Sequence, residues 1–314
     1  MYPAFSVIVF TTLSGIGFGL IALLGLGFGA PGAAFQWTAA ISACAFAVVG
    51  LVSSTLHLKS PSRAILAFSQ WRSSWLSREG VASILTLGVF GLYSLGVLFL
   101  DTRLPALGIV SAVLAMVTVY TTSMIYAQLR TVPQWATWLT SLAFLAFSVA
   151  GALLALATLA AMFDSAGARM NAQWAIGALV IAWAVKFAWW RHAGEAGLEA
   201  AGSGIGDATG LGGLGVVRPF EPPHTSPNYV MREMVFVIGR RRASALRRLA
   251  VVLGAIAPVL LAAPVALAGP SGPAPTLLVL ALLFHVGGML AERWLFFAEA
   301  EHAVGSFYGR RQAA

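Results

Sequence analysis

Long apolar runs recur along the whole chain, and they constrain its fold more than any other feature. A helix that crosses a bilayer needs about 20 mostly apolar residues, and stretches of this kind occupy most of the sequence. Only 10% of the 314 residues are charged, whereas a typical soluble protein has roughly 25%. That charge is too little to cover the surface of a soluble domain of this size. The sequence therefore predicts an integral membrane protein and excludes a soluble enzyme.

Charged and turn-forming residues divide the apolar sequence into eight runs. Lipid offers the backbone no hydrogen-bond partners, so each run is expected to form an α-helix. The predicted helices span residues 5–28, 34–56, 81–100, 107–127, 135–163, 172–190, 249–268 and 276–297. The expected fold class is an all-α integral membrane protein, built as an eight-helix transmembrane bundle. No basic segment precedes the first run, which we expect to be a helix of the mature protein and not a signal peptide.

Polar segments divide the chain further. Residues 1–190 hold six helices with an interfacial segment at 57–80, residues 191–248 form an extramembrane loop, residues 249–300 hold two helices, and residues 301–314 form a tail. Within the interfacial segment, apolar side chains that include Trp71 and Trp75 recur at near-helical spacing. This pattern predicts a short helix that lies in the membrane interface, with its tryptophans at headgroup depth.

Arginine and lysine are distributed unevenly between the two ends of the predicted bundle. The loops on the side of the N-terminus carry most of them, whereas the opposite loops carry Arg103 and Arg169. Because cytoplasmic loops are enriched in these residues, both termini are predicted to be cytoplasmic. The net charge of +8 is then explained by topology and by contact with anionic lipid. Nucleic-acid binding is not expected, because the arginines lie at membrane edges and not on one exposed patch.

Two ionisable residues lie at the same predicted depth on neighbouring helices. His57 follows the second apolar run, and Glu79 precedes the third. Such a pair suits quinone chemistry, because two protons accompany the two electrons and a histidine or carboxylate can exchange them. The alternative is structural: His57 would be an interfacial polar residue, and Glu79 a charge favoured by the dipole at a helix N-terminus. The two residues alone leave both interpretations open.

Several stretches of the sequence carry a resemblance to a known family. Residues 68–80 read FSQWRSSWLSREG, which is long enough to be specific. Other matching stretches are residues 3–8, 11–13, 123–127, 222–225, 228–229 and 231–234. Through these stretches essentially the whole chain resembles the membrane anchor subunits of the dimethyl sulfoxide reductase type, the DmsC branch of the NrfD-like anchors.

The resemblance implies a function for the predicted bundle. Anchors of this family exchange electrons between the quinone pool, menaquinone or ubiquinone, and an iron–sulfur subunit that serves a molybdopterin catalytic subunit. A histidine after the second helix and a glutamate at the start of the third serve the quinol, and His57 and Glu79 match these positions. Where Leu-Gly-Arg-Pro is expected after the histidine, this chain has Leu58-Lys59-Ser60-Pro61, so the basic residue is shifted one place earlier. The direction of electron flow and the terminal substrate, sulfite or dimethyl sulfoxide, stay open.

The expected site residues lie at one end of the bundle. The predicted quinone-binding residues are His57, Glu79, Ser77, Arg78 and Tyr126. The predicted subunit-docking residues are Arg63, Arg72, His224, Tyr229 and Arg232. The implied location is a bacterial inner membrane. The anchor is expected to be non-catalytic apart from its quinone site and to hold no metal, haem or iron–sulfur cluster, since the single cysteine, Cys44, cannot ligate a cluster.

Two alternatives to a haem-free quinone anchor make different demands on the sequence. A haem would need two histidines facing each other across helices, and His285 is the histidine expected deep inside a helix, so we predict a packed residue bonded to a neighbouring helix. The other alternative is a multi-helix membrane transporter, which is typically built from repeats around midplane charges. The predicted helices show no convincing repeat, and their midplanes are nearly free of charge, with Lys186 near a helix end.

Overall fold

The computed structural model describes residues 3–56, 61–163, 167–198, 200–218, 220–221 and 243–307. These residues form helices, turns and loops, and they include no strand. Eight helices among them are long and apolar enough to cross a membrane. They are α1 (Phe5–Gly25), α2 (Ala33–Thr55), α3 (Trp75–Phe99), α4 (Pro105–Ala127), α5 (Trp138–Met162), α6 (Gly167–Glu195), the continuous helix of α10 (Ala243–Val251), η3 (Val252–Ile256) and α11 (Ala257–Ala268), and α12 (Ala274–Ala298). The predicted all-α bundle is therefore confirmed.

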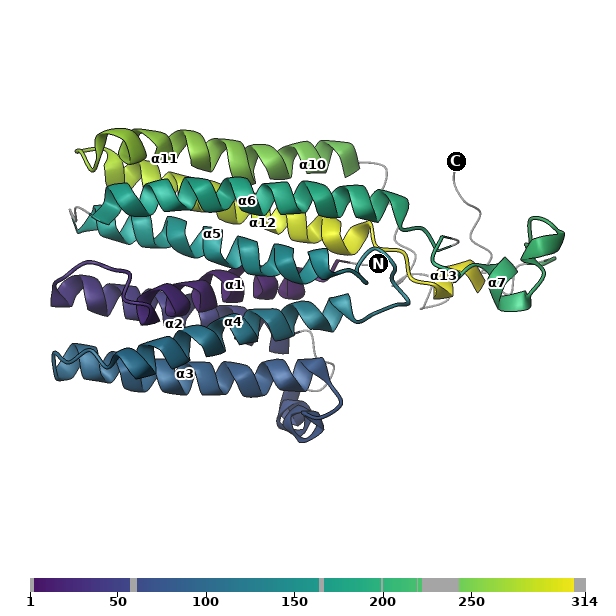
Figure 1. The fold of residues 1–314 in the computed structure, drawn as a ribbon, viewed down its shortest axis with the longest axis horizontal. Coiled ribbons are helices and arrows are strands. Elements are labelled where there is room, and N and C mark those ends of the chain that lie inside the picture. Colours follow the sequence, from purple (N-terminus) through teal and green to yellow (C-terminus); the bar gives the residue numbers. More distant parts are fainter. Residues whose placement is uncertain are drawn as a thin grey trace.

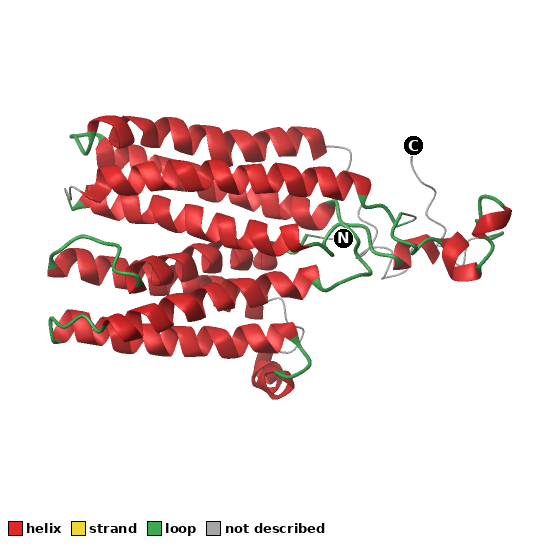
Figure 2. Cartoon of the chain, viewed as in Figure 1, coloured by secondary structure: helices red, strands yellow, loops and turns green. Residues whose placement is uncertain are grey.

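The helices lie nearly parallel to one another, and their connections gather at the two ends (Figures 1 and 2). Helix α1 occupies the centre and packs against α2, α4, α5 and α12. Helices α3 and α4 form a pair on one side of it, and α6, α10, α11 and α12 lie on the other side with α5. The central position of α1 explains why 72% of its most apolar 18-residue stretch is buried, whereas only 28% of the corresponding stretch in α2 is buried.

Helices approach one another closely where one of them carries glycine. A side chain at Gly17 would collide with the backbone of Ala47, and one at Gly25 would collide with the backbone of Gly108. In the other half, a side chain at Gly288 in α12 would collide with the backbone of Gly254 in η3. Because lipid provides no hydrophobic driving force between helices, such small-residue contacts supply much of their packing energy.

The π-helical turn η3 has a local cause in the sequence. In an α-helix the carbonyl of Gly254 would accept a hydrogen bond from residue 258, which is proline and has no N–H. That carbonyl instead accepts from Trp183 Nε1 on α6 at 3.0 Å and faces His285 Nδ1 on α12 at 3.1 Å. The proline thus frees a backbone acceptor that binds two neighbouring helices. Single π-helical turns of this kind are frequent at functional sites.

Helix α3 begins six residues before the predicted start at residue 81. Ser74 caps it, because its hydroxyl accepts a hydrogen bond from the backbone N–H of Ser77 at 3.4 Å. Trp75 and Glu79 are therefore inside α3 and not in the segment before it. The continuous helix that begins with α10 likewise starts at Ala243, six residues before the predicted residue 249.

One end of the bundle carries the polar connections (Figure 1). The described N-terminus, the loop between α4 and α5, α7 (Ile205–Thr209), η2 (Gly212–Leu214) and α13 (Val304–Phe307) all lie there. The 3₁₀ helix η1 (Pro61–Gln70) is seen end-on beside the N-terminal end of α3, so its axis runs across the bundle. The expected short helix is thus present at residues 61–70, although Trp75 belongs to α3. We call this side of the molecule the loop-bearing end.

Candidate functional site

Glu79 is buried at the loop-bearing end, within the first turns of α3. Its residue exposure is 4%, and Thr122 Oγ1 on α4 donates a hydrogen bond to its Oε1 at 2.5 Å. The same hydroxyl also approaches the carbonyl of Thr118 at 3.0 Å. A carboxyl group is costly to bury unless it is paired or hydrogen-bonded. The α3–α4 contact therefore provides a specific place for an ionisable side chain inside the bundle.

The two residues before Glu79 have different surroundings. Ser77 is buried, with 3% exposure. Arg78 is partly exposed, and its guanidinium donates to the carbonyls of Trp71 at 3.0 Å and Arg72 at 2.6 Å. It also lies over the ring of Trp75, 4.3 Å from the ring centroid. Arg78 thus fastens the turn at residues 71–74 to α3, and its predicted quinone contact stays a prediction.

Tyr126 lies at the C-terminal end of α4 and is 7% exposed. Four aromatic rings surround its own, with centroids 5.4 to 5.8 Å away: Trp135, Phe144, Phe296 and Phe297. It is within electrostatic range of both Glu79 and Arg293. Tyr126 therefore lies near both the carboxyl group of Glu79 and the charged residues of α12.

Those charges form a buried cluster that the sequence did not predict. The Glu292 carboxylate on α12 forms ion pairs with Lys186 on α6 and with Arg293, whose Nη1 lies 3.3 Å from Oε2. The three residues are at most 2% exposed. Lys186 was expected near a helix end, but it lies well inside α6 and is fully enclosed.

Aromatic faces complete the surroundings of the two buried cations. Lys186 Nζ lies 3.6 Å from the ring centroid of Trp189, and Arg293 Cζ lies 3.9 Å from that of Phe144. Such cation–π contacts offset part of the cost of removing the charges from water. The default interpretation of ionisable residues inside transmembrane helices is functional. This rule could have identified Lys186 and Glu292 as candidates. The two residues are distant in sequence, however, and nothing in either helix predicts that they pair.

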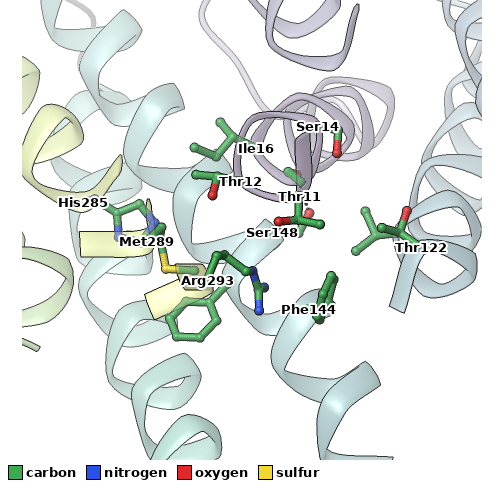
Figure 3. Close-up of a pocket in the computed structure, with 13 residues that line it drawn as sticks. Thr11, Thr12, Ser14, Ile16, Thr122, Phe144, Ser148, His285, Met289 and Arg293 are labelled. Carbon is green, nitrogen blue, oxygen red and sulfur yellow. Dashed lines mark hydrogen bonds between the residues drawn. The ribbon is translucent and has the colours of Figure 1, made fainter. Parts of the chain in front are cut away.

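A small cavity, which we call the central cavity, lies between α1, α4, α5 and α12 (Figure 3). Polar side chains on its wall include Thr11, Thr12, Thr122, Ser148, His285 and Arg293. Its volume is about 20 Å³, which is the space of one or two water molecules. The cavity is therefore too small for a quinone ring. It nevertheless connects the Glu79 site to the charged cluster, because Thr122 and Arg293 share its wall.

His285 behaves as predicted from the sequence. It is 0% exposed, and its Nδ1 is bonded to the Gly254 carbonyl of the neighbouring helix. Since a carbonyl only accepts, the ring donates through Nδ1. The prediction of a packed histidine bonded to a neighbouring helix is confirmed.

The remaining predicted site residues are only partly described. Arg72 is exposed in the turn before α3, and Arg63 belongs to η1. His57, His224, Tyr229 and Arg232 lie outside the described residues. The structure thus brings Glu79 and Tyr126 together with Arg293, which the sequence did not associate with them.

Comparisons with known proteins identify the family. The family model described as DMSO reductase anchor subunit (DmsC) matches residues 1–190. One of the subunits of sulfite dehydrogenase from Allochromatium vinosum is 30% identical over 329 aligned positions, which cover 98% of this chain and 99% of that protein. No solved structure matches the chain. The expected resemblance is confirmed: this multi-pass membrane protein belongs to the DmsC family of anchor subunits.

Proposed function

We propose that the chain is the quinone-reactive membrane anchor of a respiratory molybdoenzyme complex in a bacterial inner membrane. It exchanges electrons between the quinone pool and an iron–sulfur subunit, which passes them to or from a molybdopterin catalytic subunit. Family membership supports the anchor role. Similarity to a sulfite dehydrogenase subunit along nearly the whole chain favours the sulfite-oxidising type over the reductase type.

The buried carboxyl group of Glu79 is the observation that carries the quinone role. It is held at the loop-bearing end of the bundle by Thr122, in the α3 segment that follows η1. His57 directly follows Leu56, the cap residue of α2 at the same end. The quinone supplies a two-electron, two-proton couple, so the protein must exchange protons where the ring binds. We assign hydrogen bonding of the ring oxygen to His57 and proton exchange with water to Glu79.

Docking of the partner subunits is assigned to the same end. Helix α6 ends and α10 begins there, and Arg72 is exposed at the same end, in the turn before α3. Electrons must pass from the quinone to a nearby cluster, so a quinone site and a docking surface belong at one end. The concentration of arginine at this end favours the cytoplasmic side under the positive-inside rule.

Substitution of Glu79 by glutamine tests this function. The amide keeps the size of the side chain but cannot exchange protons, so quinone-linked turnover should fall by about 10²–10⁴-fold. Turnover of the same purified complex with an artificial electron carrier should be unchanged. Glu195→Gln, at an exposed position, is the matched control. A Glu79→Gln complex with normal quinone-linked turnover would rule out the assignment.

A transporter is the second candidate, and the buried Lys186–Glu292–Arg293 cluster is the observation in its favour. Purification separates the two candidates. An anchor co-purifies with a ferredoxin-like subunit that carries several clusters. A chain that purifies alone and moves a solute across liposome membranes would support the transporter.

A further inference from the structure

Three residues that line the central cavity each carry a polar atom that lacks a hydrogen-bond partner among the described residues. These atoms are Thr12 Oγ1, His285 Nε2 and Arg293 Nε. Their residues are 4%, 0% and 2% exposed. Buried polar groups in folded proteins are nearly always satisfied by protein or by ordered water. Figure 3 shows Thr12 and Arg293 beside His285, with Thr122 on the opposite wall.

The three atoms have complementary hydrogen-bonding chemistry. His285 donates to Gly254 through Nδ1, so Nε2 of the neutral ring is an acceptor. Arg293 Nε is a donor only, and the hydroxyl of Thr12 can donate or accept. A ligand that satisfies all three must offer both a donor and an acceptor within a very small volume.

The size of the cavity selects the ligand. A volume of about 20 Å³ exceeds the roughly 10–15 Å³ that one water needs. It excludes a lipid chain or a quinone ring. A purely apolar cavity of this kind would stay dry, but two to four polar partners hold a buried water. Both conditions for hydration are met.

We propose that the central cavity is a water-binding site, in which a buried water joins Thr12 on α1 to His285 and Arg293 on α12. The water accepts from Arg293 Nε and donates to His285 Nε2, and the Thr12 hydroxyl completes its hydrogen bonding. Thr122 lines the cavity and donates a hydrogen bond to Glu79. If Glu79 has the proposed function, the water is therefore separated from its carboxyl group by one threonine side chain. The water site itself does not depend on quinone chemistry.

Radiolytic footprinting of the intact protein in lipid nanodiscs tests the site. X-rays generate hydroxyl radicals from bound water, and these radicals oxidise the nearest sulfur to a sulfoxide. Met289 lines the cavity and is only 3% exposed. We expect Met289 to be oxidised on irradiation but not by hydrogen peroxide added to the bulk solution. Met162, which is 57% exposed, reports bulk oxidation in both cases.

Substitutions of the residues that bind the water test whether it is the source of the radicals that oxidise Met289. The double variant Thr12→Val/His285→Asn removes two partners of the water, whereas the asparagine amide keeps a donor for Gly254. Oxidation of Met289 should fall several-fold in it, and Met162 should be unaffected. Thr12→Val alone should also lower the oxidation of Met289, and this single variant provides the test if the double variant does not fold.

Thr11→Val is the control, because Thr11 lines the same cavity but its hydroxyl is bonded to the carbonyls of Val7 and Ile8. It should leave the Met289 label unchanged. No radiolytic oxidation of Met289 in the wild type, or equal oxidation in the wild type and in the Thr12→Val variants, would overturn the proposal. Since neither readout involves quinone, loss of the proposed function would leave this result intact.

Discussion

At the scale of single residues, the candidate site depends on a hydroxyl that the sequence did not single out. Thr122 is one of several threonines on α4, and no pattern distinguishes it from its neighbours. Glu79 could be predicted as a candidate because a carboxylate beside a membrane span is unusual. Its hydrogen-bond partner could not, because the partner depends on how α3 and α4 rotate against each other.

Substitution of Thr122 by valine should weaken both the site and the fold. It removes the hydroxyl that donates to the Glu79 carboxyl group, and an unsatisfied buried polar group costs about 1–3 kcal/mol. Thermal unfolding and quinone-linked turnover measure the two effects. Thr121→Val is the matched control, since Thr121 is also buried and bonded to the Thr118 carbonyl. Equal effects of the two substitutions would contradict the special role of Thr122.

The buried cluster of Lys186, Glu292 and Arg293 makes a second residue-scale prediction. Lys186→Met leaves the Glu292 carboxylate with Arg293 alone, and breaking a buried ion pair typically costs about 3–5 kcal/mol. Combining it with Glu292→Gln should cost less than the sum of the single changes, because each single change already removes the Lys186–Glu292 interaction, which the double variant loses only once. Unfolding in mixed detergent micelles measures the cycle. Arg191→Met at the exposed pair with Glu195 should change little, and strictly additive costs would argue against a coupled cluster.

At the scale of helices, the sequence predicted the elements well and their contacts poorly. Apolar runs located all eight spans, since lipid permits few other structures. The predicted start of α3 is too late because Trp75 is typical of an interfacial segment, and the sequence does not distinguish Ser74 from the adjacent Ser73 as the capping residue. The shared Gly254 carbonyl could have been anticipated from Pro258, four residues later, but its partners on α6 and α12 depend on tertiary packing.

The close crossing of α12 and η3 gives a prediction from two adjacent glycines. A Cβ at Gly288 meets the backbone of Gly254, whereas one at Gly287 meets nothing within 4 Å. Gly288→Ala should therefore force the helices apart and lower the yield of monodisperse protein on size-exclusion chromatography. Gly287→Ala should have no such effect and can even stabilise the helix slightly. Similar yields for both variants would show that the helices separate at little cost.

At the scale of the whole molecule, function is assigned to one end of the bundle. The predicted docking residues His224, Tyr229 and Arg232 all lie within residues 222–242, so a glycine–serine linker of equal length in their place should abolish co-purification of the iron–sulfur subunit. Thermal stability of the bundle should stay unchanged. A linker of the same composition at residues 201–215 is the control. Retained co-purification with residues 222–242 replaced would move the docking surface elsewhere.

The central position of α1 has a consequence for biosynthesis. Of the eight membrane helices, α1 is synthesised first, yet its partners α4, α5 and α12 emerge later and α12 is the last. Until α4 and α5 emerge, α2 is the main cover for its glycine-lined and threonine-lined faces. The first helix therefore stays incompletely packed in the membrane until the last one is inserted, and the protein completes its core only when synthesis of the eighth span ends. A chain truncated before α12 would leave α1 incompletely packed and open to proteolytic quality control.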